Sequence, residues 1–255
     1  MILLVTGGSG LIGKAIKSIK ASYNYDFIFL SSSDCDLTDF NKTKELFNEI
    51  KPDYVIHLAA NVGGLFKNMN QKVDMFEKNL LINYRESYGM YCCNGILFNH
   101  ESERRGLTFV TRKITKGLSN ILKNKQDKLV LGNLDAKRDW GHAKDFCYGM
   151  WSMLQQDEPE DFVLSTDENH TVREFVEKAF KFKNIEIVWK GSGINEIGYD
   201  KNTNKELIFI SEKYYRPAEV DLLLGDSSKA REKLGWKIKC DFDNLVKKMV
   251  EEDYK

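Results

Sequence analysis

Short apolar runs, each closed by glycines or polar residues, form the pattern at the start of the chain. Ile2 to Val5 is a run of leucine and β-branched residues, typical of one buried parallel strand. The run ends at Thr6, where glycines begin. Beyond the glycines, apolar residues recur at helical spacing, namely Leu11, Ile12, Ala15, Ile16 and Ile19. This pattern predicts a strand, a glycine turn and an amphipathic helix.

The same alternation continues after the first helix. Asp26–Leu30 predicts a second strand, and Thr38 or Asp39 can cap a helix that runs to Ile50 and stops before Pro52. Tyr54–Leu58 predicts a third strand. Strand, helix, strand, helix and strand with short links are typical of a parallel sheet with right-handed crossovers.

The later part of the chain predicts further elements in the same alternating style. A strand is expected at Cys92–Phe98, with the polar segment Asn99–Ser102 at its end facing the cofactor cleft. The remaining predicted elements are helices at Ala143–Gln155 and Thr171–Lys181, a strand at Glu186–Lys190, and a helix at Ser227–Leu234 that ends at Gly235. We expect residues 1–150 to form the cofactor-binding domain and residues 151–255 a smaller substrate lobe with some return to the first domain.

The glycine turn carries candidate chemistry. Gly7 would make a tight turn, Gly10 would leave room for phosphates, and Gly13 would let the helix pack close to the strand. The N-terminus of that helix would direct free N–H groups and the positive end of its dipole at a pyrophosphate. The alternative is a glycine turn that serves packing alone. Its place between a predicted strand and a predicted helix favours dinucleotide binding.

Composition narrows the class of protein. A chain of 255 residues with 42% hydrophobic content can form a sizeable core, and equal numbers of basic and acidic residues (38 each) indicate neither a nucleic-acid nor a membrane partner. The cysteines show no C-x-x-C pair and no disulfide spacing: they are Cys35, Cys92, Cys93, Cys147 and Cys240. Neither a signal peptide nor an apolar run of about 18 residues is present. We therefore expect a reduced, cytoplasmic, enzyme-like chain with no bound metal.

Positive charge is concentrated in one part of this neutral chain. Five cations lie between positions 104 and 138, namely Arg104, Arg105, Arg112, Lys113 and Arg138. Arginine forks match phosphate oxygens in pairs, so a sugar-nucleotide diphosphate is a ligand suited to such a set. For each residue alone, the alternative is a solvated surface charge.

The end of the second strand bears on the choice of cofactor. An acidic residue there would bind the ribose 2′-hydroxyl of NAD and repel the 2′-phosphate of NADP. This chain has Ser31, Ser32 and Ser33 at that point and places Asp34 and Asp36 farther on. The serines favour NADP, although no arginine stands beside them. The alternative is that they form a plain solvated loop.

Two stretches of the chain resemble two families of extended short-chain dehydrogenases, also called NAD-dependent epimerases/dehydratases. Thr6–Gly13, Ser31–Ser32, Asp36–Asp39 and His57–Phe66 resemble the GDP-L-fucose synthases, and this similarity covers residues 1–82. Residues 83–240 resemble the GDP-mannose 4,6-dehydratases. That similarity is carried by Asn83–Gly89, Asn94–Ser102, Arg104–Gly106, Phe109–Ile114, Leu131–Ala143, Arg216–Asp221 and Leu224–Asp226.

The resemblance implies residues for each ligand. The cofactor would be held by Gly7, Gly10, Ile12, Gly13, Asp36, Leu37, Leu58, Ala59, His100 and Arg105. A GDP-mannose-like sugar nucleotide would be held by Asn99, Val110, Lys113, Arg138, Arg216 and Glu219. Homo-oligomers, or association with intact relatives, would be the expected assembly.

The family's catalytic Tyr-x-x-x-Lys is missing, because none of the 11 tyrosines has a lysine four positions on. The two similarities meet near residues 82–84, where the unit with the fourth strand and the tyrosine–lysine helix would lie. The resemblance therefore predicts an α/β fold: a Rossmann-type doubly wound parallel sheet that lacks its usual fourth strand, with a smaller C-terminal α/β substrate lobe. One fused helix is expected at residues 73–89, with Met75, Phe76, Leu80 and Leu81 on its inner face. The strand after it would then pair with the first strand, in the order 3-2-1-5.

Three functions remain open on the sequence alone. The first is a GDP-mannose 4,6-dehydratase-like protein that binds NADP and a GDP-hexose. The second is a GDP-L-fucose synthase-like epimerase–reductase, supported only by the N-terminal third. The third is a non-catalytic protein that binds NADP or a GDP-sugar, or a rearranged remnant of the two families.

Overall fold

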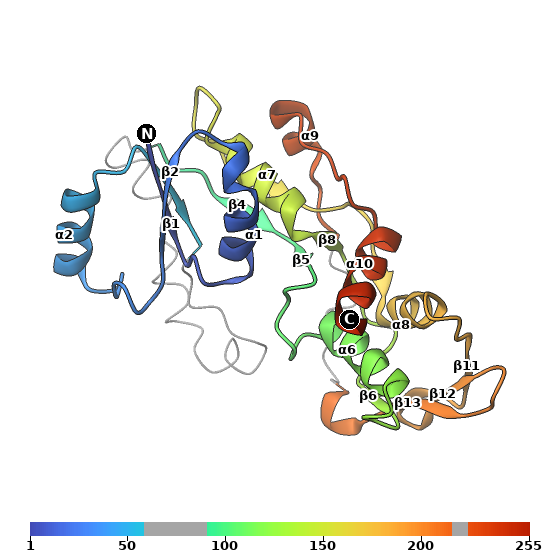
Figure 1. Ribbon diagram of the computed structural model, residues 1–255. Helices are drawn as coiled ribbons and strands as arrows, with labels where there is room; N and C mark the ends of the chain where they lie inside the picture. The colour runs from blue at the N-terminus through green and yellow to red at the C-terminus, as the bar shows by residue number, and fades with distance from the viewer. Residues whose placement is uncertain (59–90, 216–223) are drawn as a thin grey trace. The chain divides into compact units, whose positions relative to one another are not determined.

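The computed structural model describes residues 1–58, 91–215 and 224–255 of the chain (Figure 1). The predicted fused helix at residues 73–89 and its inner face lie outside these residues. The chain divides into two compact units. Unit 1 comprises Met1–Ile96, Phe146–Phe162 and Glu232–Trp236, and unit 2 comprises Leu97–Asp145, Val163–Arg231 and Lys237–Lys255. The division into domains at residue 150 stays a prediction.

Unit 1 is built on a parallel sheet with the order β2-β1-β3. Its strands are β1 (Ile2–Thr6), β2 (Asp26–Leu30) and β3 (Tyr54–His57), so all three predicted strands are confirmed. Leu3, Leu4 and Val5 of β1 are fully buried. A strand buried in this way needs backbone partners on both edges. β2 provides them on one edge and β3 on the other.

The predicted strand order 3-2-1-5 is wrong. β3 takes the edge of β1 that this order gives to the strand at Cys92–Phe98, through the pairs Leu3↔Tyr54 to Thr6↔His57. The later strand is shorter than predicted, β4 (Gly95–Leu97), and it pairs with β9 (Phe162–Leu164). Because β1 is already paired on both edges, β4 has no free edge of β1 to join.

Two helices of unit 1 follow the predicted bounds and lie on opposite sides of the β1–β2 pair (Figure 1). α1 (Leu11–Ile19) buries Ile12, Gly13, Ala15 and Ile16 and is followed by the 3₁₀ turn η1 (Lys20–Ser22). α2 (Phe40–Ile50) begins at Asp39, whose carboxylate accepts hydrogen bonds from two first-turn amides, those of Asn41 and Lys42. Lys51, at φ 46°, ends it.

The predicted helix at Ala143–Gln155 is α7 (Ala143–Met153). Within unit 1, its Trp151 packs on Tyr23, Tyr25 and Tyr54, with ring centroids 5.0 to 6.4 Å apart. These aromatic contacts lie at the end of the sheet where β2 and β3 begin, and the glycine loop lies where β1 ends. The two features therefore occupy opposite ends of the sheet.

Unit 2 contains a four-stranded sheet in the order β11-β12-β13-β6. Its strands are β11 (Ile187–Lys190), β12 (Ile197–Asp200), β13 (Glu206–Ile210) and β6 (Leu129–Leu131), and only the last pair is parallel. Two small pairings complete the unit: β5 (Asn99–Glu101) runs parallel to β8 (Trp140–His142), and β7 (Lys137–Arg138) runs antiparallel to β10 (His170–Thr171).

Three helices form the core of unit 2: α6 (Val110–Leu122), α8 (Val172–Lys181) and α10 (Phe242–Tyr254). Their inner faces bury Ile114, Leu118, Phe175, Phe180, Leu245 and Met249. The remaining elements are α9 (Ser228–Leu234) and the 3₁₀ turns η2 (Gly193–Asn195) and η3 (Glu212–Tyr214). The predicted helices at Thr171–Lys181 and Ser227–Leu234 and the strand at Glu186–Lys190 are confirmed. α6 and α10 were not predicted.

Candidate functional site

The loop between β1 and α1 has the backbone conformation that its glycines allow. Gly7 has φ +69°, a region that other residues rarely adopt. The amides of Gly8 and Gly10 donate to the carbonyls of Leu30 (2.7 Å) and Gly7 (2.9 Å). Gly10 is the N-cap of α1, and among the described residues no side chain caps this helix end. The first-turn N–H groups of α1 therefore stay available for an anion.

Close approach explains two further glycines of the loop. A Cβ at Gly13 would lie 2.5 Å from the Cα of Gly8, so α1 can meet the loop only without a side chain there. A Cβ at Gly8 would lie 2.8 Å from the Cβ of Phe29 in β2. Gly13 was predicted to let the helix pack close to the strand, and the close approach in the structure is to Gly8 of the loop. Gly8 is a required glycine that was not predicted. Ile12, another predicted cofactor residue, is buried beside Gly13.

The ends of β1 and β3 are joined beside this loop. The Thr6 hydroxyl and the His57 Nδ1 lie 2.8 Å apart, and the amide of Leu58 donates to the carbonyl of Thr6 (3.1 Å). Thr6 is buried, and burial lowers the pKa of His57. Leu58 is thereby held next to the glycine loop in unit 1. Ala59 lies outside the described residues.

The segment after β2 folds back on itself. The carboxylate of Asp34 accepts hydrogen bonds from the amide and the hydroxyl of Ser31, both at 2.7 Å, and these bonds lower the pKa of Asp34. Asp36 accepts from the amide (3.0 Å) and the hydroxyl (2.7 Å) of Thr38. Leu37, which lies between Asp36 and Thr38 in the chain, is half-buried. The tip of β2 thus carries serine hydroxyls together with two exposed carboxylates.

The candidate residues of unit 2 begin on β5. Asn99 donates through Nδ2 to the carbonyl of Asp139 (3.2 Å), and the Nδ1 of His100 lies 2.9 Å from the carbonyl of Phe98. Burial lowers the pKa of His100, and the nearby charge of Arg105 acts in the same direction. His100 and Arg105, the two predicted cofactor residues of this segment, belong to unit 2.

Arg105 is held by its own unit. Its Nε lies 3.2 Å from the Glu101 carboxylate, and its guanidinium lies 3.6 Å from the centre of the Phe109 ring. Glu101 is 2% exposed and accepts a hydrogen bond from the Thr111 hydroxyl (2.7 Å). Burial raises the pKa of Glu101 and lowers that of Arg105. This ion pair makes Arg105 part of a largely buried network with Glu101 and Thr111.

Lys113 lies at the start of α6, one turn after Val110, and its ammonium group is 3.8 Å from the centre of the Tyr214 ring. Burial lowers the pKa of Lys113. Tyr214 in turn lies against Gly132, where a Cβ would collide with the Tyr214 carbonyl. Arg138 lies on β7 opposite His170. The other two predicted ligand residues, Arg216 and Glu219, lie outside the described residues.

Arg112, one of the five clustered cations, has a structural partner. Its Nε donates to the buried carboxylate of Asp253 (2.6 Å), and its Nη1 donates to the carbonyl of Arg105 (3.0 Å). Arg112 therefore joins α6 to α10. For this cation, ligand binding stays a prediction beside its structural role.

Residues 1–58, 91–215 and 224–255 contain no group of three His, Cys, Asp or Glu side chains placed to hold a metal ion. No helix in the same ranges is both long enough and apolar enough to cross a bilayer.

Comparison with known sequences gives two family matches. A model for GDP-mannose 4,6 dehydratase matches residues 74–249, and a model for the NAD dependent epimerase/dehydratase family matches residues 3–85. A GDP-mannose 4,6 dehydratase of Dictyostelium discoideum is 58% identical over 174 residues, 68% of this chain and 49% of that protein. The human protein of the same name is 55% identical over the same length, 47% of its own. The chain thus spans about half the length of the curated relatives it matches.

Solved structures resemble the whole chain in fold. The structure of RMD from Pseudomonas aeruginosa complexed with NADPH matches with a TM-score of 0.74 at 15% identity and covers 99% of both chains. The UDP-glucose 4-epimerase of Thermus thermophilus in complex with NAD matches with a TM-score of 0.73 at 16% identity, again over 99% of both chains. At these identities the similarity shows a Rossmann-type α/β fold.

Proposed function

The chain belongs to the GDP-mannose 4,6-dehydratase family, and on this premise we propose that it binds NADP and a GDP-hexose in GDP-sugar metabolism. The glycine loop of unit 1 is the observation that carries the cofactor part. Gly7 has a positive φ, Gly10 presents no side chain, and no side chain of the described residues caps the start of α1. These features leave backbone N–H groups and the positive end of a helix dipole for a diphosphate.

The remaining cofactor contacts are proposed from the same region. Leu58 and Leu37 would cover the bound nucleotide, and Asp36 and the serines at the tip of β2 would meet the adenine ribose. Serine hydroxyls can donate to a 2′-phosphate, which supports NADP over NAD. When bound, NADP supplies the group that accepts and returns a hydride.

The GDP-hexose is proposed to bind to unit 2. Asn99 offers an amide, Arg138 a guanidinium, and Lys113 an ammonium group at the start of α6. Arginine and lysine donors of this kind suit a diphosphate. The relatives named GDP-mannose 4,6-dehydratase support a GDP-sugar as the ligand class.

Turnover is expected to be weak. In the family pattern a lysine four residues after a tyrosine lowers the tyrosine pKa, so that the phenol can act as a base at neutral pH. No tyrosine of this chain has that lysine. Losing one member of such a unit costs orders of magnitude in rate. We therefore expect binding of both ligands with dehydration of GDP-mannose far slower than by a relative that has the pair.

Calorimetric titration of matched variants tests the cofactor site. Gly7→Ala places a side chain at φ +69° in the loop and should abolish NADPH binding. Gly193→Ala imposes similar strain at φ +58°, where a Cβ meets no atom, in a turn of unit 2, and should leave NADPH binding unchanged. An equal loss of NADPH binding in both variants would show that general backbone strain lowers the affinity, and would contradict a cofactor site at the glycine loop.

The ligand site of unit 2 is tested on one helix. Lys113→Gln should weaken GDP-mannose binding, and Lys116→Gln, one turn along α6, should not. Each binding ligand should also raise the melting temperature, because a ligand at about 100 times its Kd stabilises the native state by about 2.7 kcal/mol. A wild-type protein that binds neither ligand would contradict the proposed function.

A further inference from the structure

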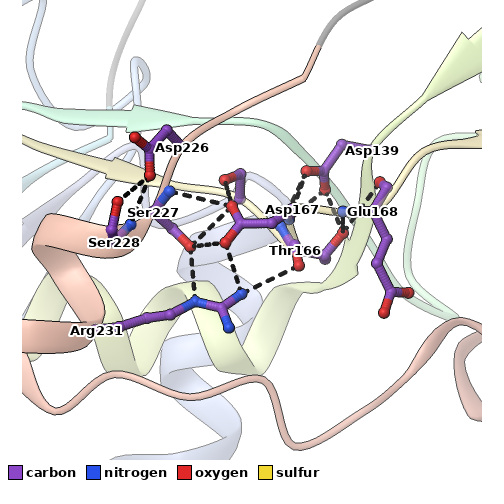
Figure 2. Close-up of polar contacts among 9 residues, drawn as sticks. Asp139, Thr166, Asp167, Glu168, Asp226, Ser227, Ser228 and Arg231 are labelled. Atoms are coloured by element: carbon purple, nitrogen blue, oxygen red, sulfur yellow. Dashed lines mark hydrogen bonds and ion pairs between the residues drawn. The ribbon is translucent and has the colours of Figure 1, made fainter.

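A buried carboxylate connects three segments of unit 2. Asp139 lies between β7 and β8, and its side chain is fully buried. Figure 2 shows its carboxylate facing the turn at Thr166 and Asp167. It accepts hydrogen bonds from the amide of Thr166 (3.0 Å to each oxygen), the hydroxyl of Thr166 (2.8 Å) and the amide of Asp167 (3.2 Å). These donors offset part of the cost of burying the charge, and burial still raises the pKa of Asp139.

The turn itself is tightly held on its other side. Asp167 has φ +63°, and its carboxylate accepts from the amide (3.1 Å) and the hydroxyl (2.9 Å) of Ser227. Arg231 of α9 forms an ion pair with Asp167 (2.8 Å) and donates to the carbonyl of Thr166 (3.2 Å), as Figure 2 shows. Contacts from Ser227 and Arg231 thus hold this turn in place, and the Asp139 carboxylate is hydrogen-bonded to it.

The other atoms of Asp139 lie beside two candidate ligand residues. Its main-chain carbonyl accepts the hydrogen bond from the Asn99 side chain (3.2 Å). Arg138 precedes it in the chain, and on β7 it lies opposite His170, three residues after Asp167. Asp139 therefore connects the rigid turn to both side chains. A shift of Asp139 would move its own carbonyl, which accepts from the Asn99 side chain, together with the backbone of Arg138.

We propose that Asp139 is a positioning residue that holds Asn99 and Arg138 in the geometry that binds the GDP-hexose. This inference rests on the proposed function. Asp139 does not touch the ligand in this account. Its effect comes from the three donors of the turn, which fix its carboxylate, and from the Asn99 amide, which its carbonyl fixes.

The first test is Asp139→Asn, which keeps the size of the side chain. The amide Nδ2 of the new asparagine would replace one carboxylate oxygen that accepts from the turn. That acceptor is lost, and the Nδ2 group then faces an N–H or O–H group that is also a donor. We expect the Kd for GDP-mannose to rise about tenfold or more and the Kd for NADPH to stay within about twofold. Asp200→Asn is the matched control, because Asp200 accepts from Asn202 and Thr203 in an exposed turn of unit 2.

A second pair of variants separates positioning from general stability. Thr166→Ser keeps the hydroxyl donor and should keep GDP-mannose affinity, whereas Thr166→Val removes it and should weaken that affinity. Hydrogen exchange should show faster exchange of the Thr166 amide in Asp139→Asn than in the wild type.

The outcomes of these experiments lead to different conclusions. Unchanged GDP-mannose affinity in Asp139→Asn would overturn the positioning role and leave the proposed function standing. Parallel loss of GDP-mannose and NADPH binding would also overturn it, because general destabilisation would then explain the effect. A wild-type protein that binds no GDP-mannose would overturn both proposals.

Discussion

Asp253→Ala removes the carboxylate that joins α6 to α10. In the native protein its Oδ2 accepts from the Arg112 Nε and from the Thr115 hydroxyl, both at 2.6 Å. Asp253 is 3% exposed and lies in the last turn of α10, where the helix dipole disfavours an acidic side chain. The cation of Arg112 compensates for this position. The variant leaves that cation buried without its carboxylate.

The expected loss follows from burial. Removing one partner of a buried ion pair costs about 3–5 kcal/mol, because the other charge stays uncompensated. The Arg112 side chain is 16% exposed and keeps its bond to the Arg105 carbonyl, which places the loss near the lower limit, at about 3 kcal/mol. At about 2–4 °C per kcal/mol, the melting temperature should fall by about 6–12 °C.

Urea denaturation of single and double variants measures this loss. Glu252→Ala is the control on the same helix, since the Glu252–Lys255 pair (2.7 Å) is exposed and should contribute less than about 1 kcal/mol. The double variant Arg112→Ala/Asp253→Ala should lose less stability than the sum of its single variants. If Asp253→Ala costs no more than Glu252→Ala, the buried pair does not stabilise the contact between α6 and α10.

Three further variants test other parts of the structure. Gly132→Ala should displace Tyr214 and weaken GDP-mannose binding with NADPH binding unchanged, as measured by calorimetry; equal weakening of both would contradict this. The His142 Nε2, 3.5 Å from the Glu103 carboxylate, lowers the pKa of Glu103 to about 2, so the stabilisation from this contact is complete above the ordinary pKa of 4.5 and is lost as pH falls toward 2. The difference in urea midpoint between wild type and Glu103→Gln should shrink over that window, and a constant difference would refute it. Thr171→Ala removes the capping box of α8 and should cost about 1 kcal/mol by the same assay, whereas Thr171→Ser should cost little.

Elements with a clear local pattern could be predicted from the sequence. The β1–glycine–α1 unit has a run, a break and a helical period within residues 2–19, and the Asp39 cap marks the start of α2. α6 was missed because its inner face is partly polar. Thr111, Thr115 and Ser119 recur every four residues and are buried, where an apolar period would place leucine. The hydrogen bonds of Thr115 and Ser119 go to Asp253, more than 130 positions away, and no local pattern indicates such a partner.

The candidate site divides in the same way. The need for glycine at positions 7 and 13 could be predicted, because it depends on local backbone geometry. The partners of the cations could not be predicted. In the sequence Arg112 and Arg105 resemble phosphate-binding arginines, and only the fold places Asp253 and Glu101 beside them. Strand order was mispredicted for a similar reason, because a list of strands does not state which edge of β1 each one joins.

Calorimetric titration of the wild-type protein with NADPH and with GDP-mannose is the most direct test of the account. We predict saturable binding of both ligands at one site each, a higher melting temperature with either, and little or no conversion of GDP-mannose. Absence of binding for both ligands would contradict the proposed NADP and GDP-hexose sites. Dehydration of GDP-mannose at the rate of a relative with the Tyr-x-x-x-Lys pair would contradict the expected weak turnover.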